Sequence, residues 1–302
     1  MNRGQVAALW RTTFQDSEAF IRLFFLHFYR RRQTFSISCK GQVVSALQVL
    51  PYEMTTSPGE PPLRLAYIVG CCTDPRHRGK GYMGQLLERA LSESHRQGFD
   101  VAALIPASPS LFAYYGKSGF STSCFFSQRT YHLDRQVEEV PSCRFVRLKA
   151  HTATRFYPFF ARCLRQRSFS MLHNGLQFRA AVADAYLDQG GVYGLLQQDY
   201  LKPLAMAFVT PSPPVIAAQA GTSSPSSSPY IKELVSTSAS AEQTLLNRIL
   251  ALYHSSSALC RIAPPATLCR HSPPLPYGMS LALSKRFAGV ASPSLYLNLM
   301  LD

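Results

Sequence analysis

The chain has 302 residues, a formal net charge of +14 and 46% hydrophobic residues, which is enough apolar material for two domains of ordinary size. No run of about 18 apolar residues occurs, so we expect no transmembrane helix, and the start MNRGQVAALWRTTF lacks the apolar core of a signal peptide. These features favour a folded cytoplasmic protein over a membrane or secreted one.

The charge balance and the cysteines narrow the class of ligand. The 31 Lys and Arg outnumber the 17 Asp and Glu, and such an excess attracts polyanions, which include nucleic acids and phosphorylated coenzymes. The basic residues are scattered, apart from three arginines at 30–32, and form no known nucleic-acid motif, so nucleic acid is the weaker alternative. The eight cysteines form no C-x-x-C pair and no metal-ligand spacing with histidine, so we expect no disulfide framework and no metal.

The N-terminal part of the chain predicts two helices and a hairpin. Asp16 or Ser17 can cap the second helix, whose aromatic residues fit core packing better than a substrate pocket. A Lys40-Gly41 turn joins the two strands of the hairpin. The predicted bounds are 3–14 and 18–29 for the helices, 34–39 and 42–50 for the strands, and 52–62 for a loop rich in Pro, Ser and Gly.

An apolar strand, a basic glycine-rich loop and an amphipathic helix follow between Leu63 and Gly98. Glycine at positions 79 and 81 lets the backbone take positive φ and lie close to a ligand. The unpaired N–H groups of the first helical turn then converge on an anion, for which a phosphate or pyrophosphate is the natural guest. Neither the Walker A nor the Rossmann spacing is present; the loop reads R-x-x-G-x-G.

The next elements predicted are a strand over 99–106, a short helix over 109–117 and a strand over 124–133. With the loop, they complete a pattern that resembles the GNAT superfamily of N-acetyltransferases. The R-x-x-G-x-G loop after a strand carrying T-x-P is similar to the acetyl-CoA loop of that family, and FAYYGKSGF at 112–120 is similar to its F-Y-x-x-x-G-F segment. The resemblance covers residues 1–140 and implies an α/β fold with a mixed central sheet flanked by helices.

The resemblance also implies how acetyl-CoA is held. Strand backbone at 71–73 is expected to pair with the pantetheine, loop amides at 79–84 to bind the pyrophosphate, and three basic side chains to add charge, while His77 is expected to be solvated surface. The expected acetyl-CoA contacts are Cys71, Cys72, Thr73, Arg76, Arg78, Gly79, Lys80, Gly81, Tyr82, Met83 and Gly84.

A tyrosine is the candidate general acid. In GNAT domains the tyrosine of the second segment stands beside the thioester sulfur, and Tyr115 occupies that position. A phenol with an ordinary pKa of about 10 is protonated at neutral pH and can donate to the sulfur. The neighbouring Tyr114 is the competing candidate.

Beyond residue 141 the sequence repeats the same plan. LLNRIL at 245–250 corresponds to LLERAL at 86–91, and Tyr230-Ile231 precedes the second as Tyr67-Ile68 precedes the first. No R-x-x-G-x-G occurs between these second-copy segments, so the sequence predicts two tandem GNAT folds, the second degenerate. The expected domains are 1–140, catalytic, and 141–302, with a mobile Pro- and Ser-rich loop at 211–229 and a docked C-terminal strand at 293–302.

The general base has no obvious candidate in the first copy. Many GNAT enzymes place a glutamate on the strand before the loop, but residues 63–73 hold no carboxylate. The enhanced-intracellular-survival (Eis) acetyltransferases resemble this chain in pairing an active with a degenerate domain, and in them the terminal carboxylate serves as base. The resemblance implies that role for the α-carboxylate of Asp302, although we expect no counterpart of their third, sterol-carrier-like domain in these 302 residues.

The expected reaction is direct transfer of acetyl from acetyl-CoA to a primary amine of a small molecule or peptide. Cys71 and Cys72 are expected to pack rather than to form an acyl-enzyme. A non-catalytic acyl-CoA-binding or anion-binding module that recruits a partner is the alternative. The identity of the acceptor is not readable from these residues, and a homo-oligomer is compatible with them.

Overall fold

A computed structural model describes residues 3–57, 59–134, 136, 139–187, 189–198, 202–211, 228–262, 274–288 and 295–298. Contacts divide the chain into two compact units. The first comprises Met1–Cys124 and Tyr277–Leu295, and the second Phe125–Pro276 and Tyr296–Asp302. The division expected at residue 140 is sequential, whereas each of these units includes a segment from a distant part of the chain.

The first unit is built on a mixed sheet in the strand order β1-β2-β3-β4-β12. Only β3 and β4 run parallel to each other; the other neighbouring pairs are antiparallel. The elements are α1 (Arg3–Thr13), α2 (Glu18–His27), β1 (Thr34–Cys39), β2 (Gln42–Met54), β3 (Leu63–Thr73), α3 (Tyr82–Arg96), β4 (Val101–Leu104), α4 (Pro109–Gly116), β12 (Leu275–Ala282) and α10 (Lys285–Ala288), with 3-10 turns η1 (Arg31–Gln33) and η2 (Pro75–His77).

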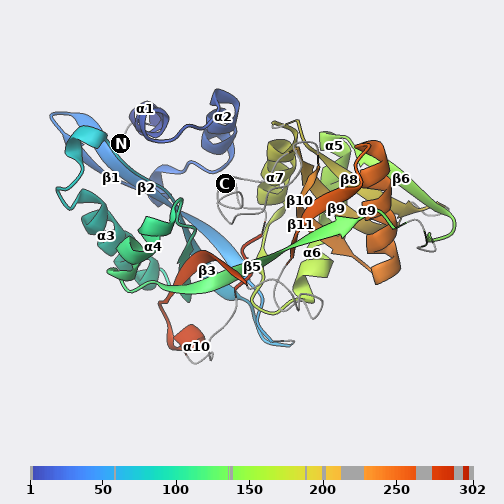
Figure 1. The fold of residues 1–302 in the computed structure, drawn as a ribbon. Coiled ribbons are helices and arrows are strands. Elements are labelled where there is room, and N and C mark those ends of the chain that lie inside the picture. The colour runs from blue at the N-terminus through green and yellow to red at the C-terminus, as the bar shows by residue number, and fades with distance from the viewer. Residues whose placement is uncertain are drawn as a thin grey trace. The chain divides into compact units, whose positions relative to one another are not determined.

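Helices cover both faces of this sheet (Figure 1). Because successive strand residues point to opposite faces, Leu47 and Val49 pack with α3 residues such as Leu86, while Gln48 between them points to the other face. On that other face Trp10 of α1 lies against the backbone of Gly70. The two helices α1 and α2 therefore lie on one side of the sheet, and α3 and α4 on the other.

Two details of the first unit differ from the sequence prediction, and one alternative that it left open is decided. The strand β2 runs on to Met54, through residues expected to form a loop, with Pro51 in register with Ala66. Of the two cap candidates, Ser17 caps α2 by accepting from the Phe20 N–H at 3.1 Å. The strand β12 was not predicted, because it pairs with residues far away in sequence and no local pattern marks it.

The second unit repeats this arrangement. Its sheet has the order β5-β11-β10-β9-β8-β6, and β10 and β11 are its parallel pair. On β9, Ala205 and Ala207 pack against α9, whereas Met206 and Phe208 pack against α6 and α7 on the other face. The elements are β5 (Ser121–His132, of which Ser121–Cys124 belongs to the first unit), β6 (Cys143–Leu148), α5 (Ala150–Ala153), η3 (Thr154–Phe156), α6 (Tyr157–Arg165), β7 (Met171–Leu172), α7 (Gly175–Leu187), β8 (Gly191–Gln197), β9 (Pro203–Thr210), β10 (Tyr230–Ser236), α9 (Ala239–Leu252) and β11 (Ser257–Ile262).

Two expectations fall largely outside the described residues. The structure does not describe residues 212–227, which make up most of the loop expected to be mobile at 211–229. It also does not describe the last four residues, which include Asp302. Of the expected C-terminal strand, the structure describes Leu295 and Tyr296 as isolated bridges and the two residues after them. Among the described residues, no helix is both long and apolar enough to cross a bilayer.

Candidate functional site

The two parallel strands of the first unit are paired at one end only. Their register joins Leu65 to Val101 and ends where Tyr67 meets Ala103, although β3 continues to Thr73. Beyond Tyr67 the backbone N–H and C=O groups on this edge of β3 lie outside the register with β4. An extended ligand can pair with such groups as an added strand does.

A bulge marks the same part of β3. Ala46 pairs with Cys72 but Gln48 pairs with Val69, so that Gly70 and Cys71 together lie opposite one residue of β2. Gly70 has φ +64°, a conformation that glycine adopts without a steric penalty. The bulge sets which side chains of the following segment face the ligand side of the strand.

The side chains at 71–73 alternate as strand residues do. Cys71 and Thr73 line a cavity of about 630 Å³, whereas Cys72 is 1% exposed, with its thiol 3.7 Å from the Ala46 carbonyl oxygen. Thr73 is held in place by a 2.8 Å hydrogen bond between its hydroxyl and that of Ser45. The prediction that Cys72 contacts acetyl-CoA therefore rests on its backbone alone.

The basic loop follows directly from this strand. Gly79 and Gly81 have φ +76° and +75°, and Gly81 is the N-cap of α3 without a side-chain hydrogen bond to the first turn. A Cβ built on either glycine meets nothing within 4 Å. The first-turn N–H groups of α3 consequently remain available to an anion, as the glycine pattern predicts.

The basic residues of the loop do not all face the cavity. Arg78, Lys80 and His77 line it, although His77 was expected to be solvated surface. Arg76 does not line it and instead binds the Asp74 carboxylate through Nη2 at 2.9 Å. These hydrogen bonds, together with one from the Arg76 backbone N–H, hold the pKa of Asp74 well below its usual range.

Two tyrosines reach the cavity from α4. Tyr115 is buried and its hydroxyl forms a hydrogen bond with the Cys71 thiol, whereas Tyr114 is 38% exposed. Burial, and after it the nearby Cys71 thiol, raises the pKa of Tyr115 far above that of a free phenol. Burial also raises the pKa of Cys71 to about 12. At neutral pH both groups therefore keep their protons.

The cavity as a whole combines an anion site with an apolar, hydrogen-bonding end. None of its described lining residues is a carboxylate, and no group of three or more His, Cys, Asp or Glu side chains that could hold a metal occurs in the described part of the chain. Sequence reasoning missed five of the lining residues, four of which carry no motif. The lining residues are Thr13, Phe14, Cys71, Thr73, His77, Arg78, Gly79, Lys80, Gly81, Tyr82, Met83, Ser108, Leu111, Tyr114 and Tyr115.

The corresponding loop of the second unit is closed to an anion. Only Thr237 and Ser238 separate β10 from α9, and the Ser238 hydroxyl accepts from the Ala241 N–H at 3.2 Å. The first turn of α9 also carries Glu242, which disfavours a bound anion through its own negative charge. The degenerate second copy expected from the sequence therefore has a physical basis in this cap.

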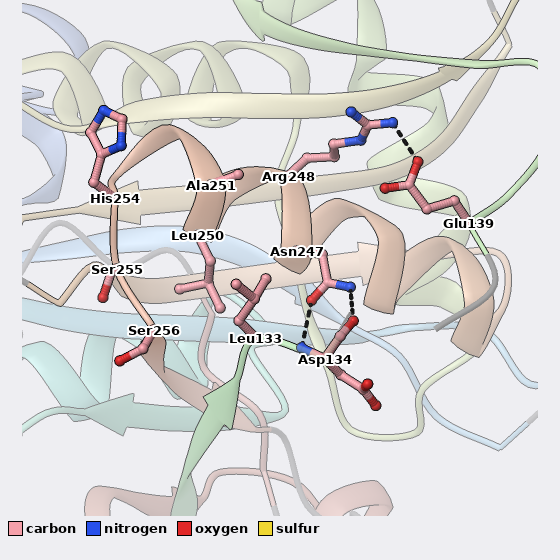
Figure 2. Close-up of a pocket in the computed structure, with 10 residues that line it drawn as sticks. All are labelled: Leu133, Asp134, Glu139, Asn247, Arg248, Leu250, Ala251, His254, Ser255 and Ser256. Atoms are coloured by element: carbon pink, nitrogen blue, oxygen red, sulfur yellow. Dashed lines mark hydrogen bonds and ion pairs between the residues drawn. The ribbon is translucent and has the colours of Figure 1, made fainter. Parts of the chain in front are cut away.

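A hollow of about 800 Å³ in the second unit lies at the other end of α9 (Figure 2). Three of its polar side chains have partners within the lining: Arg248 pairs with Glu139, and the Asn247 amide bonds to the backbone of Asp134. These bonds attach the chain after β5 to the C-terminal half of α9. The hollow therefore differs from the cavity of the first unit, which lies at the N-terminus of a helix.

Comparison with known families identifies the first copy. Residues 3–123 match the family model described as the acetyltransferase (GNAT) domain. Over this segment the chain is similar to GNAT acetyltransferase domains. The segment contains the bulge, the splayed strand, the glycine loop and Tyr115. No curated protein sequence matches the chain.

Solved structures extend the likeness over both units. A protein of unknown function from Enterococcus faecalis V583, a probable N-acyltransferase, is similar with a TM-score of 0.74 and 13% identity over 93% of this chain and 70% of its own. A GCN5-related N-acetyltransferase from Anabaena variabilis has a TM-score of 0.69 at 16% identity, over 93% of this chain and 70% of its own. Eis1 from Mycobacterium abscessus has 0.68 at 12% identity, over 96% and 73%. At such identities these likenesses show the fold, which is a tandem GNAT-type α/β fold.

Proposed function

We propose that the protein is an acetyl-CoA-dependent N-acetyltransferase that moves acetyl directly to a primary amine of a small molecule or peptide. The observation that carries this proposal is the meeting of three features at one cavity: the uncapped loop before α3, the splayed end of β3 and the buried Tyr115. The GNAT domain supports acetyl transfer as the reaction class.

The residues of the cavity fit acetyl-CoA. The positive-φ glycines leave room for a pyrophosphate against the amides of Gly79–Gly84, and Arg78 and Lys80 add positive charge beside it. The backbone of Cys71–Thr73 would pair with the pantetheine. Arg76 contributes less than expected from the sequence, because its guanidinium is already bound to Asp74. Bound acetyl-CoA supplies an activated acetyl thioester.

Tyr115 is assigned the role of general acid. In the transfer, the amine nitrogen forms a bond to the acetyl carbon, the carbon–sulfur bond breaks, the amine gives up a proton and the sulfur gains one. The raised pKa of Tyr115 keeps its proton available at any physiological pH, and its position beside Cys71 sets it at the ligand-facing edge of β3. Tyr114 lies nearer to solvent and is the weaker choice.

The state of Cys71 supports direct transfer rather than a covalent acyl-enzyme. A nucleophilic cysteine acts as the thiolate, and reactive cysteines have a lowered pKa. Cys71 has instead a pKa raised to about 12, and Cys72 is buried against β2. Burial thus raises the pKa of both thiols, whereas a ping-pong mechanism needs a thiol whose pKa is lowered.

For the general base that takes the proton from the amine, we propose the α-carboxylate of Asp302, as the family resemblance implies. The contacts of residues 296–298 in the second unit support it. Three hydrogen bonds fix the residues that precede the described end of the chain: Tyr296 Oη to Glu233, Arg261 Nη2 to Leu297 O at 2.6 Å, and His173 Nε2 to Asn298 Oδ1 at 2.7 Å. A cytoplasmic location is proposed with the enzyme, and the free thiols of the described cysteines are compatible with it.

Calorimetry with acetyl-CoA tests the cofactor site. Gly81→Asp should abolish detectable binding, because it adds bulk and negative charge at a positive-φ position of the loop. Gly41→Asp is the matched control: Gly41 also has positive φ, also has nothing within 4 Å of its Cβ position and lies in the β1–β2 turn, so binding should be unchanged.

A screen of primary amines for release of free thiol then tests the reaction. Wild type that neither binds acetyl-CoA nor releases thiol would refute the enzyme. Binding without turnover of any amine would favour the non-catalytic acyl-CoA-binding module.

A further inference from the structure

The end of α1 reaches the cavity of the first unit from the other face of the sheet. Thr13, the last residue of α1, and Phe14 after it line this cavity together with Tyr115 of α4. The helices α1 and α4 cover opposite faces of the sheet (Figure 1), so the cavity is lined from both faces at the splayed end of β3. One side supplies the loop and Tyr115, and the other side supplies Thr13 and Phe14.

The Thr13 hydroxyl is fixed in one hydrogen-bonding role. Its Oγ1 donates to the Leu9 carbonyl oxygen at 2.9 Å, and no described residue donates a hydrogen bond to it. A hydroxyl has one proton and two lone pairs, so while that bond is kept the oxygen can only accept from a ligand. Thr13 is half-buried and lines the cavity, so a ligand in the cavity can reach these lone pairs. The oxygen therefore favours a ligand group that carries an N–H or O–H.

The neighbouring contacts hold this end of α1 in place. The Phe14 N–H donates to the Trp10 carbonyl oxygen at 2.9 Å, and the centroids of the two rings are 5.0 Å apart. The Trp10 indole lies against Gly70 of β3 and donates to Asp16 at 2.6 Å. Thr13 and Phe14 are thus positioned beside β3 before a ligand binds, which avoids the free-energy cost of ordering them on binding.

The lining at this end is neutral and partly apolar. No carboxylate occurs among the described residues that line the cavity. A ligand with several ammonium groups would lose hydration there without gaining a paired charge, whereas an amine on an apolar group would bury that group against the Phe14 ring. This end of the cavity therefore fits a monoamine carried on an apolar substituent.

We propose that Thr13 binds the acceptor amine, with Oγ1 accepting a hydrogen bond from its N–H, and that Phe14 selects an amine carried on an apolar group. This inference rests on the proposed function, because it places the acetyl thioester at the splayed end of β3. A primary amine that attacks through its lone pair still carries N–H groups, and a hydrogen bond from one of them to a fixed oxygen orients the lone pair. A neutral hydroxyl is not a base, so Thr13 orients the amine and a separate group takes the proton.

A role in the helix alone predicts that Thr13 behaves like its neighbour Thr12. Threonine hydroxyls in helices bond to carbonyl groups one turn back, and Thr12 Oγ1 donates to the same Leu9 carbonyl oxygen, also at 2.9 Å. Thr12 is exposed and is not among the described residues that line the cavity. Comparison of the two threonines therefore separates binding of the acceptor from support of the helix.

The experiment compares Thr13→Val with Thr12→Val as the matched control and with Thr13→Ser, which keeps the hydroxyl. The readouts are the acetyl-CoA Kd by calorimetry and kcat/KM for two amines, benzylamine and spermidine. Wild type should have the higher kcat/KM for benzylamine. Thr13→Val should lower that kcat/KM about tenfold, the loss expected for one neutral hydrogen bond, and leave the acetyl-CoA Kd unchanged. Thr12→Val and Thr13→Ser should keep the wild-type values of both.

An unchanged kcat/KM in Thr13→Val, or an equal loss in Thr12→Val, would overturn the inference alone. A weaker acetyl-CoA Kd in Thr13→Val would also overturn it, because the hydroxyl would then bind the pantetheine. A wild type that prefers spermidine, or that acetylates other primary amines but not benzylamine, would overturn the assignment of the acceptor class. A wild type that acetylates no primary amine removes the proposed function, and the role of Thr13 with it.

Discussion

Substitution of Gly70 by alanine tests whether the bulge of β3 is as tightly enclosed as the structure shows. At φ +64° an alanine adopts a left-handed conformation that costs about 1–2 kcal/mol. Its Cβ would also lie 2.3 Å from Trp10 Cζ3, closer than carbon atoms can approach. The Gln48 oxygen, at 2.4 Å, can rotate away, but the indole cannot, because Nε1 donates to Asp16 at 2.6 Å and the ring packs against α2.

Relieving this overlap requires α1 or β3 to move, and overpacking of a buried site costs about 1–3 kcal/mol. The two contributions give a loss of about 2–5 kcal/mol in the free energy of unfolding of the first unit. Gly79→Ala is the matched control, because Gly79 has φ +76° and nothing within 4 Å of its Cβ position. It should lose only the backbone contribution, about 1–2 kcal/mol.

Urea unfolding followed by the fluorescence of Trp10, the single tryptophan, measures the free energy of unfolding of both variants. The two values can be compared when both variants unfold with the same dependence on urea concentration. Equal destabilisation of the two would show that the Trp10 contact is absent and would remove the geometric basis for placing the end of α1 beside β3. A larger loss for Gly70→Ala, accompanied by loss of turnover, would confirm that the bulge is both enclosed and functional.

Three further predictions concern the general acid, the tail and the separability of the first unit, and a fourth concerns pH. Tyr115→Phe should lower kcat about 10²–10⁴-fold and leave the acetyl-CoA Kd unchanged; an unchanged kcat would remove Tyr115 as the acid. Deleting Leu301 and Asp302 should reduce turnover with coenzyme binding intact, and full turnover in the truncated protein would exclude the terminal carboxylate as base. Residues 1–140 expressed alone should aggregate, since they lack β12, and a soluble, monomeric fragment would contradict this. Burial lowers the pKa of His173 from 6.5 to about 4, so between these pH values the unfolded chain binds a proton that the folded chain does not. The free energy of unfolding should therefore decrease by up to about 3 kcal/mol as the pH is lowered from 6.5 to 4. Urea unfolding at several pH values should show this decrease in wild type and not in His173→Gln.

Local patterns predicted the parts of the site whose geometry depends on neighbours in sequence. The glycines of the loop and the helix that follows are both of this kind. The Asx-type cap of Asp74, which also captures Arg76, was open to prediction, because Asp before Pro commonly initiates such a turn.

Other features were beyond sequence reasoning because they depend on contacts between distant residues. The sequence predicts Gln48 as an ordinary strand residue. Only the structure shows that it lies next to Trp10 and Gly70 and that its amide has no hydrogen-bond partner among the described residues. His77 lines the cavity because η2 turns the chain after Asp74, which a list of residue types does not reveal. Asp302, whose α-carboxylate the family resemblance implies as the base, lies outside the described residues.

The strand β12 connects the second half of the sequence to the catalytic geometry of the first unit. β4 is one wall of the splay; its four residues are fully buried, and it meets β3 over only three register pairs, Leu65 to Val101 through Tyr67 to Ala103. Its other edge is paired with β12 from Val101 to Leu104, through Ala282 to Met279. A strand so short cannot hold its position through β3 alone, and without β12 it would present an unpaired apolar edge. The opening between β3 and β4 therefore depends on residues 279–282, which come from the second half of the sequence but belong to the first unit.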